Sequence, residues 1–349
     1  MSQRALVVGG TGPTGVPLVE QLLANGFTVA IYHTGGHEVE FSGPVEHIHG
    51  DPRNSDDIAA RVGNQEWDVA ICTSGRLRAL AELLAGHTRR FVGITGQPVY
   101  RGATRPTPAG AIAIPVPEDA PRQYDALDYT GKVAAGEDQI LEQHARGDFE
   151  AVIVRYPGVF GPRGSLSHEW SIVRRIRDGR PHMAMPHDGI ACFQRGYTRN
   201  LAHLVYLAAT VPAAAGEVFN GGDERVMTAR AVAQTIVDEL GASMEFVGMP
   251  APWCRGAFPL AEKSNLVLDM SKARALLGYR DVVDVETATR ETARWLMSEE
   301  ARGMQFSEHF AGALSYKDED HIIAAWRAAE AAFAAATNAD QQSPTEVRP

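Results

Sequence analysis

The chain has 349 residues and a formal net charge of −10, with 43 acidic and 33 basic side chains. This length suffices for one α/β domain and a smaller lobe, and the negative charge argues against nucleic acid and anionic membranes as partners. The three cysteines, Cys72, Cys192 and Cys254, form no CxxC pair, and no apolar run reaches the ~20 residues of a membrane span, so a cytoplasmic protein is expected.

The first segment joins an apolar run to a glycine motif. Ala5 to Val8 are typical of a buried parallel strand, and Gly9, Gly12 and Gly15 follow directly before an amphipathic helix. Backbone N–H groups at the positive end of such a helix suit a pyrophosphate. Glycine is needed because a side chain would hold the phosphates away and separate the helix from the strand. The motif predicts a dinucleotide site; the alternative is a turn that binds nothing.

Strand-like and helix-like segments then alternate through the first half of the chain. The expected strands are 28–32, 45–49, 69–72, 91–95 and 151–155, and the expected helices are 55–62, 77–85 and 129–144. Such alternation is typical of an α/β fold with a doubly wound parallel sheet. Residues 96–122 contain six prolines, so we predict a long loop over the site.

The second half is less regular. Residues 162–200 are rich in Arg, His and Gly, and helices are expected near 201–208 and at 229–240, 271–277 and 286–296. An apolar stripe of Ile322, Trp326, Ala329 and Phe333 predicts a last helix, for which packing on its own chain is favoured over binding a partner. The predicted domains are 1–160 for the dinucleotide, with 198–225 returning to it, 161–337 for the substrate lobe and C-terminal helices, and 338–349 as a disordered tail.

Further motifs follow the glycine triplet in order. They are Gly50-Asp51-Pro52-Arg53, Val99-Tyr100, Gly131-Lys132 with Glu137, Arg155 to Pro162, Arg195 to Ala202, Asn220-Gly-Gly222 with Thr228, and Ser271-Lys272-Ala273 with Leu277-Gly278-Tyr279. Over roughly residues 4–297 the set resembles the extended short-chain dehydrogenase/reductase family, the group of nucleotide-sugar epimerases and dehydratases. The resemblance implies a Rossmann sheet, NAD or NADP as cofactor, and a smaller C-terminal lobe that closes over substrate.

The chain departs from the family's catalytic pattern. The family's lysine matches Lys132, but its tyrosine position, four residues earlier, holds Asp128, while Tyr129 stands three residues earlier. The position of its serine or threonine holds Gly96, with Thr95 beside it. The sequence therefore looks like the atypical members of the family.

The proton donor must have a pKa that allows proton exchange near neutral pH, which a nearby ammonium group promotes for a phenol. Third and fourth neighbours on a helix both lie near a reference residue, although they differ by about 100° around the axis. A small adjustment of the loop at the helix start would compensate for this difference in the case of Tyr129. Tyr129 is therefore favoured as the proton donor. Asp128 as the acid, Asp128 merely paired with Lys132, and no acid from this helix are the alternatives.

The predicted cofactor contacts come from these motifs and from the strand ends. They are Gly9, Thr11, Gly12, Pro13, Thr14, Gly15, His33, Asp51, Pro52, Cys72, Lys132, Tyr156, Pro157 and Val159. The second strand ends without the acid that NAD-selecting relatives carry, and a glycine-rich turn with a histidine suits a 2′-phosphate, so NADP is favoured over NAD. Asp51 resembles the family's adenine-contacting acid; alternatively it caps the helix that starts near Ser55.

The predicted substrate contacts are Tyr100, Arg163, His168 and Arg195, three of them in the second lobe, where the family contacts substrate. The two arginines could clamp a phosphate or carboxylate, or they could be solvated surface charges.

A metal site is not expected. The twelve histidines form no His-x-x-x-His pair, and the pairs His182/His187 and His47/His49 have no Cys or acidic companion at ligand spacing.

These observations predict an NAD(P)-dependent oxidoreductase, epimerase or dehydratase that acts on a hydroxyl- or carbonyl-bearing small molecule, sugar-like or a secondary metabolite. Lys132 would hold the nicotinamide ribose and lower the pKa of a neighbouring acid. The alternatives are a non-catalytic dinucleotide-sensing or scaffolding protein, and RNA binding, which is known among atypical relatives but opposed by the net charge. The substrate stays open, as does the oligomeric state, for which a homodimer is one option.

Overall fold

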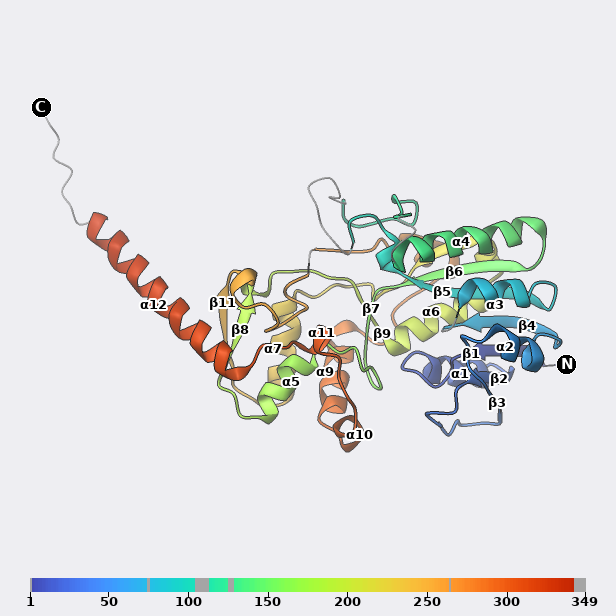
Figure 1. Ribbon diagram of the computed structural model, residues 1–349, viewed down its shortest axis with the longest axis horizontal. Coiled ribbons are helices and arrows are strands. Elements are labelled where there is room, and N and C mark those ends of the chain that lie inside the picture. The colour runs from blue at the N-terminus through green and yellow to red at the C-terminus, as the bar shows by residue number, and fades with distance from the viewer. Residues whose placement is uncertain (1, 74–75, 104–112, 125–128, 264, 342–349) are drawn as a thin grey trace, which may run out of the picture.

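A seven-stranded parallel sheet forms the centre of the computed structural model, which describes residues 2–73, 76–103, 113–124, 129–263 and 265–341 (Figure 1). Its strand order is β10-β6-β5-β4-β1-β2-β3. The strands are β1 (Arg4–Val8), β2 (Thr28–His33), β3 (Val45–His49), β4 (Trp67–Cys72), β5 (Thr88–Gly96), β6 (Glu150–Tyr156) and β10 (Glu217–Asn220). The predicted doubly wound parallel sheet is confirmed.

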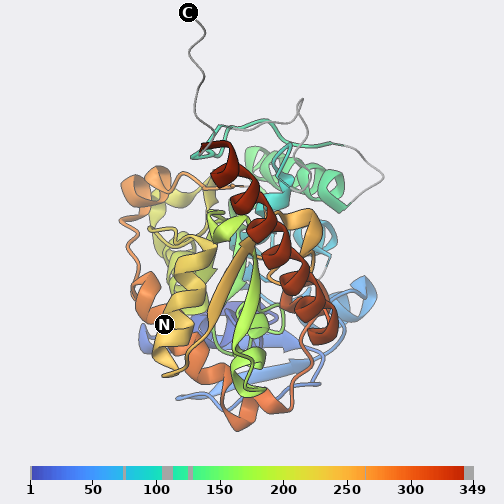
Figure 2. The same cartoon turned by 90° about the vertical axis from the view of Figure 1, so that its left-hand side faces the viewer.

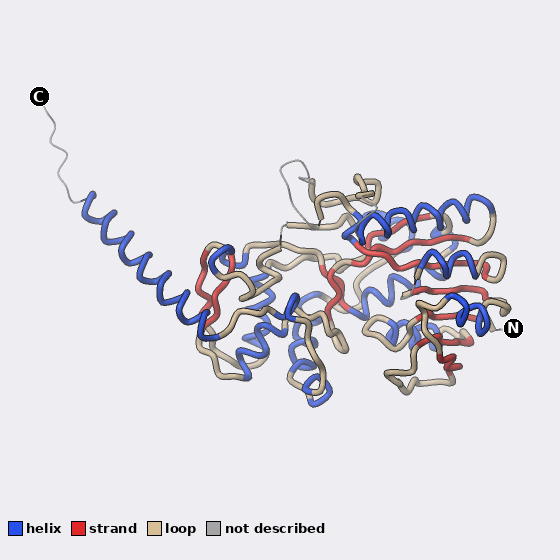
Figure 3. Tube along the Cα trace, in the orientation of Figure 1, coloured by secondary structure: helices blue, strands red, loops and turns tan. Residues whose placement is uncertain are grey.

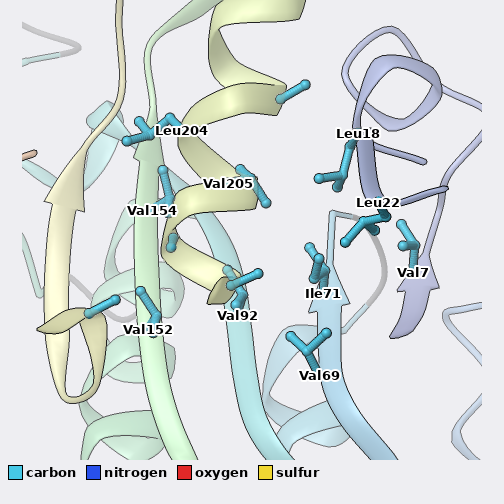
Figure 4. Packing of buried hydrophobic residues seen from close by; sticks show 14 of the residues in the cluster. Val7, Leu18, Leu22, Val69, Ile71, Val92, Val152, Val154, Leu204 and Val205 are labelled. Atoms are coloured by element: carbon cyan, nitrogen blue, oxygen red, sulfur yellow. The ribbon is translucent and has the colours of Figure 1, made fainter. Parts of the chain in front are cut away.

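Helices cover both faces of this sheet, which explains why its central strands contain continuous apolar runs, such as residues 5–8 of β1 and 151–154 of β6. One face packs against α1 (Gly15–Ala24), α6 (Thr198–Thr210) and α8 (Ser271–Leu277). The other packs against α2 (Ser55–Val62), α3 (Leu77–Leu83) and α4 (Tyr129–Arg146). Figure 4 shows the first face, where Leu18 and Leu22 of α1 and Leu204 of α6 lie over the strand valines.

The strand order has a switch point beside β1. The chain goes from β1 outward to β2 and β3 on one side, and then returns to β4 on the other side. In open α/β sheets a crevice forms at the carboxyl ends of the strands at this point, and ligands bind there. The glycine motif between β1 and α1 therefore stands where the fold itself favours a ligand.

A second, smaller lobe follows the sheet. Figure 3 shows its two short parallel strand pairs apart from the central sheet, β7 (Gly158–Phe160) with β9 (Arg195–Tyr197), and β8 (His182–Pro186) with β11 (Glu245–Met249). Its helices are α5 (Trp170–Arg177), α7 (Ala229–Glu239), α9 (Val285–Leu296), α10 (Glu299–Arg302) and α11 (Glu308–Ala311). The core of this lobe joins apolar residues of α5, α7, α9 and β8.

The last helix, α12 (Tyr316–Gln341), leaves the lobe and extends into solvent (Figure 1 and Figure 2). Its first turns pack on the protein, where Ile323 is buried and the ring of Trp326 lies 5.2 Å from that of Trp253. Phe333, at the end of the predicted stripe, is 72% exposed. The prediction that the apolar stripe packs on its own chain is therefore confirmed only for the first half of the stripe. The helix also runs into the predicted tail, of which only 342–349 lie outside the described residues.

Among the described residues, no helix combines the length and apolar character needed to cross a membrane.

Candidate active site

The glycine motif forms an open cradle at the start of α1. A Cβ atom added to Gly12 would meet no atom within 4 Å, whereas one added to Gly15 would lie 2.6 Å from the backbone of Gly10. Gly10 itself has a φ of 87°, a conformation that other residues rarely adopt. Thr14 makes no side-chain cap, and the first turn of α1 carries no acid. The cradle therefore fits an anionic group, with Gly12 leaving space and Gly10 and Gly15 allowing close packing.

The predicted cofactor contacts His33, Asp51 and Cys72 lie at the carboxyl ends of neighbouring strands. Asp51 accepts hydrogen bonds from the backbone and side chain of Arg53, which lower its pKa. Asn54, not Asp51, caps α2, so the alternative role for Asp51 is wrong. Cys72 ends β4 with its side chain in the core, where burial raises the pKa of the thiol. A cofactor would therefore meet the backbone around Cys72 rather than its sulfur.

A cavity of about 950 Å³ lies where the second lobe meets the ends of β5 and β6. Two of the predicted cofactor contacts, Pro157 and Val159, line it, while the phenol of Tyr156 is buried, which raises its pKa. The described lining residues are Gln97, Pro98, Ala103, Pro157, Gly158, Val159, Leu166, His168, Phe193, Arg255, Gly256, Pro259, Glu262, Lys263, Glu308, His309, Phe310 and Ala313. This size matches sites for small molecules.

His168 is the predicted substrate contact that lines this cavity. Burial, together with the charges of Lys263, Arg195 and His309, lowers its pKa to about 3, so its ring is neutral at pH 7. Its Nε2 atom is buried and has no hydrogen-bond partner among the described residues. A neutral imidazole with a free nitrogen is suited to a hydrogen bond with an uncharged ligand group.

Gln97 and Lys263 are among the cavity residues that the sequence analysis missed. Gln97 follows β5 and is buried, and its Oε1 atom has no described partner. Lys263 comes from the second lobe, and burial lowers its pKa. The motif order could have directed attention to Gln97, because it follows Gly96 directly. Nothing in the local sequence marks Lys263, whose place depends on the packing of the lobe.

The predicted substrate contacts other than His168 have protein partners. The hydroxyl of Tyr100 donates to Asn220, and Arg155 Nη1 donates to Tyr100 at 3.0 Å. The burial of Tyr100 raises its pKa to about 12. A substrate could reach this hydroxyl only if the network opened.

The two arginines proposed as an anion clamp are also paired. Arg195 is buried, bonded to Glu169, with its guanidinium 4.1 Å from the ring centroid of Phe160. Arg163 pairs with Glu300 at 3.3 Å on the surface. Neither belongs to the described cavity lining, so the structure does not bring them together as a clamp.

Thr95, beside the position of the family's serine or threonine, is held by a buried carboxylate. Glu137, on α4, is fully buried and binds Arg155 through two hydrogen bonds of 3.0 and 2.7 Å. The hydroxyl of Thr95 donates to the same carboxylate at 2.7 Å. With its proton committed to Glu137, Thr95 can accept but not donate a hydrogen bond towards a ligand.

The predicted Tyr–Lys pair lies at the start of α4. Tyr129 is the first residue of this helix, and Lys132 is exposed without an ion-pair partner among the described residues. Asp128 lies outside the described residues. Lys132 is thus available to a ligand, and the choice between Tyr129 and Asp128 as proton donor stays a prediction.

The histidines at the end of β2 and on β3 are closer to an acid than their spacing suggested. His47 and His49 each lie 3.0 Å from a carboxylate oxygen of Glu38, and His33 lies 3.2 Å from His47. His47 and His49 therefore do have an acidic companion, and the prediction that they lack one is wrong, because the loop after β2 folds Glu38 back onto β3.

Comparison with known proteins agrees with this geometry. Residues 73–222 match the model of the NAD dependent epimerase/dehydratase family. The predicted family resemblance is confirmed. The matched segment contains Thr95, Lys132 and Glu137, while the glycine cradle precedes it. The uncharacterized protein YbjS of Escherichia coli K12 is 25% identical over 208 residues, which cover 52% of this chain and 60% of that relative.

Solved structures share the fold over most of this chain. UDP-glucose 4-epimerase from Bifidobacterium longum, in complex with NAD⁺ and UDP, is 16% identical with a TM-score of 0.68, over 85% of this chain and 99% of that one. DesIV from Streptomyces venezuelae, a dTDP-glucose 4,6-dehydratase with NAD and TYD bound, is 19% identical with a TM-score of 0.66, over 86% and 98%. At these identities the likeness shows the fold, a Rossmann sheet with a C-terminal lobe.

Proposed function

We propose that the protein is a nicotinamide-dinucleotide-dependent epimerase, dehydratase or reductase acting on a hydroxyl- or carbonyl-bearing small molecule, sugar-like or a secondary metabolite. The position of the cavity carries this proposal. It joins the ends of β5 and β6 to polar groups of the second lobe, at the edge of the sheet that also carries the glycine cradle.

The chain's own residues have distinct roles in this proposal. The backbone of Gly9 to Gly15 binds the pyrophosphate, and Lys132 holds the nicotinamide ribose. Tyr129 exchanges a proton with the reacting oxygen, with Asp128 as the alternative. A bound dinucleotide supplies hydride transfer at its nicotinamide. Because β2 ends on His33 rather than an acid, we expect NADP to bind more tightly than NAD.

The cavity's polar groups suggest the substrate class. Lys263 and Arg255 line it as cations, beside the carboxylates of Glu262 and Glu308. The Lys263 ammonium lies about 6 Å from the rings of Phe193 and Phe310 rather than in an ion pair with a described residue. We therefore expect a substrate with an anionic group near Lys263 and a hydroxyl near His168.

The test is turnover with a panel of sugar nucleotides and carbonyl compounds, followed by the absorbance of the reduced nicotinamide or by product analysis. Lys132→Ala should lower both dinucleotide affinity and turnover, because one ammonium serves both. Tyr129→Phe should keep dinucleotide affinity and lower turnover about 10²-fold or more, the contribution of a positioned acid. Tyr206→Phe, a partly buried tyrosine on α6, is the matched control.

If Tyr129→Phe kept its turnover and Asp128→Asn lost it, the proton donor would be Asp128 and not Tyr129. Turnover kept in both variants would place the acid elsewhere, in the 96–122 loop or on bound water. Tight dinucleotide binding without turnover on any member of the panel would instead support a sensing or scaffolding protein.

A further inference from the structure

Three imidazoles and one carboxylate meet at the edge of the central sheet, outside the cavity and the catalytic helix. His33 ends β2, His47 and His49 lie on β3, and Glu38 comes from the loop between the strands. One potential ligand atom from each lies within 4.8 Å of all the others. Among the residues that the structure describes, no other group of three or more His, Cys, Asp or Glu has this geometry.

The sheet itself brings the imidazoles together. In a strand, residues two apart share a face, which places His47 and His49 on the same side of β3. In the parallel register His33 stands opposite His49, and Ile31 opposite His47. β3 is the edge strand, and the side chains of His49 and Glu38 are more than half exposed, so the cluster is reached from solvent. His33 forms the buried inner side.

The distances suit one small ion. The nitrogen–nitrogen distance between His33 and His47 is 3.2 Å, and the two carboxylate oxygens of Glu38 lie 3.0 Å from the nitrogens of His47 and His49, one oxygen to each. Four ligands at ~2.0–2.1 Å from a tetrahedral ion lie about 3.4 Å apart, close to these values. The three rings meet at interplanar angles of 71°, 77° and 82°, so no two of them stack face to face.

We propose that His33, Glu38, His47 and His49 bind one divalent transition-metal ion of the Zn²⁺ class. Imidazole nitrogens favour Zn²⁺ and its neighbours in the first transition row, whereas Mg²⁺ and Ca²⁺ prefer oxygen ligands. Four protein ligands leave no open position, which is the pattern of a structural rather than a catalytic ion. The ion would fasten the 34–44 loop to β2 and β3.

Binding through His33 Nε2 puts the ring proton on Nδ1. The contact from the Gly35 N–H to Nδ1, already long at 3.3 Å, must then open. The ion would also lie one residue from the point where β2 supports the glycine cradle, since the Gly9 N–H donates to the carbonyl of Tyr32 at 2.9 Å. A metal here would stabilise the loop on the ribose side of the dinucleotide site, a consequence that rests on the proposed function.

The experiment uses the full chain without a histidine tag, stripped with a chelator and dialysed. Titration with Zn²⁺, followed by calorimetry, should give one ion per chain, and Co²⁺ should give the intense visible absorption of a tetrahedral ion. His49→Ala and Glu38→Gln change exposed side chains, so these variants should fold. Loss of an outer-sphere partner already costs about 10–100-fold in metal affinity, so loss of a ligand should cost ~100-fold or more.

His87→Ala is the matched control, because His87 also forms a surface pair with a glutamate, 3.1 Å from Glu66. It should leave Zn²⁺ affinity unchanged. No stoichiometric binding, or equal affinity in His49→Ala and wild type, would overturn the proposal. If neither protein bound metal and the His49 variant also lost NADP affinity, the cluster would serve the 2′-phosphate instead of a metal. None of these readouts depends on turnover, so failure here leaves the proposed function standing.

Discussion

Gly12 and Gly15 have different roles in the glycine motif. Gly15 has no space for a Cβ, because the backbone of Gly10 lies against it, so its substitution should disturb the packing of α1 on β1. Gly12 faces open space, so its substitution should disturb only what binds there. The sequence predicts the motif but not this division, which depends on how closely α1 approaches the loop.

Buried Asp223 gives a pH-dependent contribution to stability. Its Oδ1 atom accepts hydrogen bonds from the backbone of Tyr197 and from Asn200, both at 2.9 Å, but burial raises its pKa to about 7. An unfolded chain loses this proton near pH 4. Between pH 4 and 7 the folded state therefore holds more protons, and stability falls as pH rises, by at most about 1.4 kcal/mol per pH unit.

Asp223→Asn removes this titration. Its unfolding free energy should therefore fall less steeply than that of wild type between pH 4 and 7, as measured by urea unfolding at several pH values. Asp119→Asn, at an exposed position, is the control and should keep the wild-type slope. Equal slopes in wild type and Asp223→Asn would contradict the argument.

Residue contacts across the fold were the least predictable feature. His33 was assigned from the end of its strand, but its contact with His47 required the register of β2 and β3. Lys263 joins the cavity through the packing of the second lobe. Such contacts depend on the relative placement of segments, which local patterns do not encode.

At the scale of elements, long periodic segments were predictable. The structure has a strand at 45–49 and helices at 55–62 and 271–277, with the expected bounds. The strands β7, β8, β9, β10 and β11 were missed because each is short and pairs with a segment far away in the chain. The predicted helix at 201–208 begins three residues earlier, at Thr198.

The attachment of α12 is an element-scale feature that can be tested. Glu319 on α12 and Arg175 on α5 are fully buried and joined by two hydrogen bonds of 3.0 and 2.9 Å. Glu319→Ala would leave the guanidinium buried without its partner, which should cost about 3–5 kcal/mol of unfolding free energy. Glu330→Ala, on the exposed half of the same helix, should stay within about 0.5 kcal/mol of wild type.

The unfolding free energies of both variants are measured by chemical denaturation. If Glu319→Ala were no less stable than Glu330→Ala, the buried pair would not be what holds α12 to the lobe.

At the scale of the whole molecule, the site is divided between two parts. The sheet provides the cradle and the strand ends, and the second lobe provides His168, Lys263 and the aromatic wall of the cavity. The sequence predicts this division because the motif order matches the family. It does not predict the cavity's lining, since the residues that meet there come from segments as distant as Gln97 and Ala313.

We propose that the cradle between β1 and α1 binds a nicotinamide dinucleotide. The most direct measurement is a calorimetric titration of wild type and Gly12→Val with NADP and NAD. Wild type should bind one dinucleotide per chain, NADP more tightly than NAD. Gly12→Val should keep the wild-type thermal midpoint, because the added side chain enters open space, but should bind neither. Dinucleotide affinity in folded Gly12→Val equal to that of wild type would contradict the account, and a tenfold preference of wild type for NAD would refute the choice of NADP.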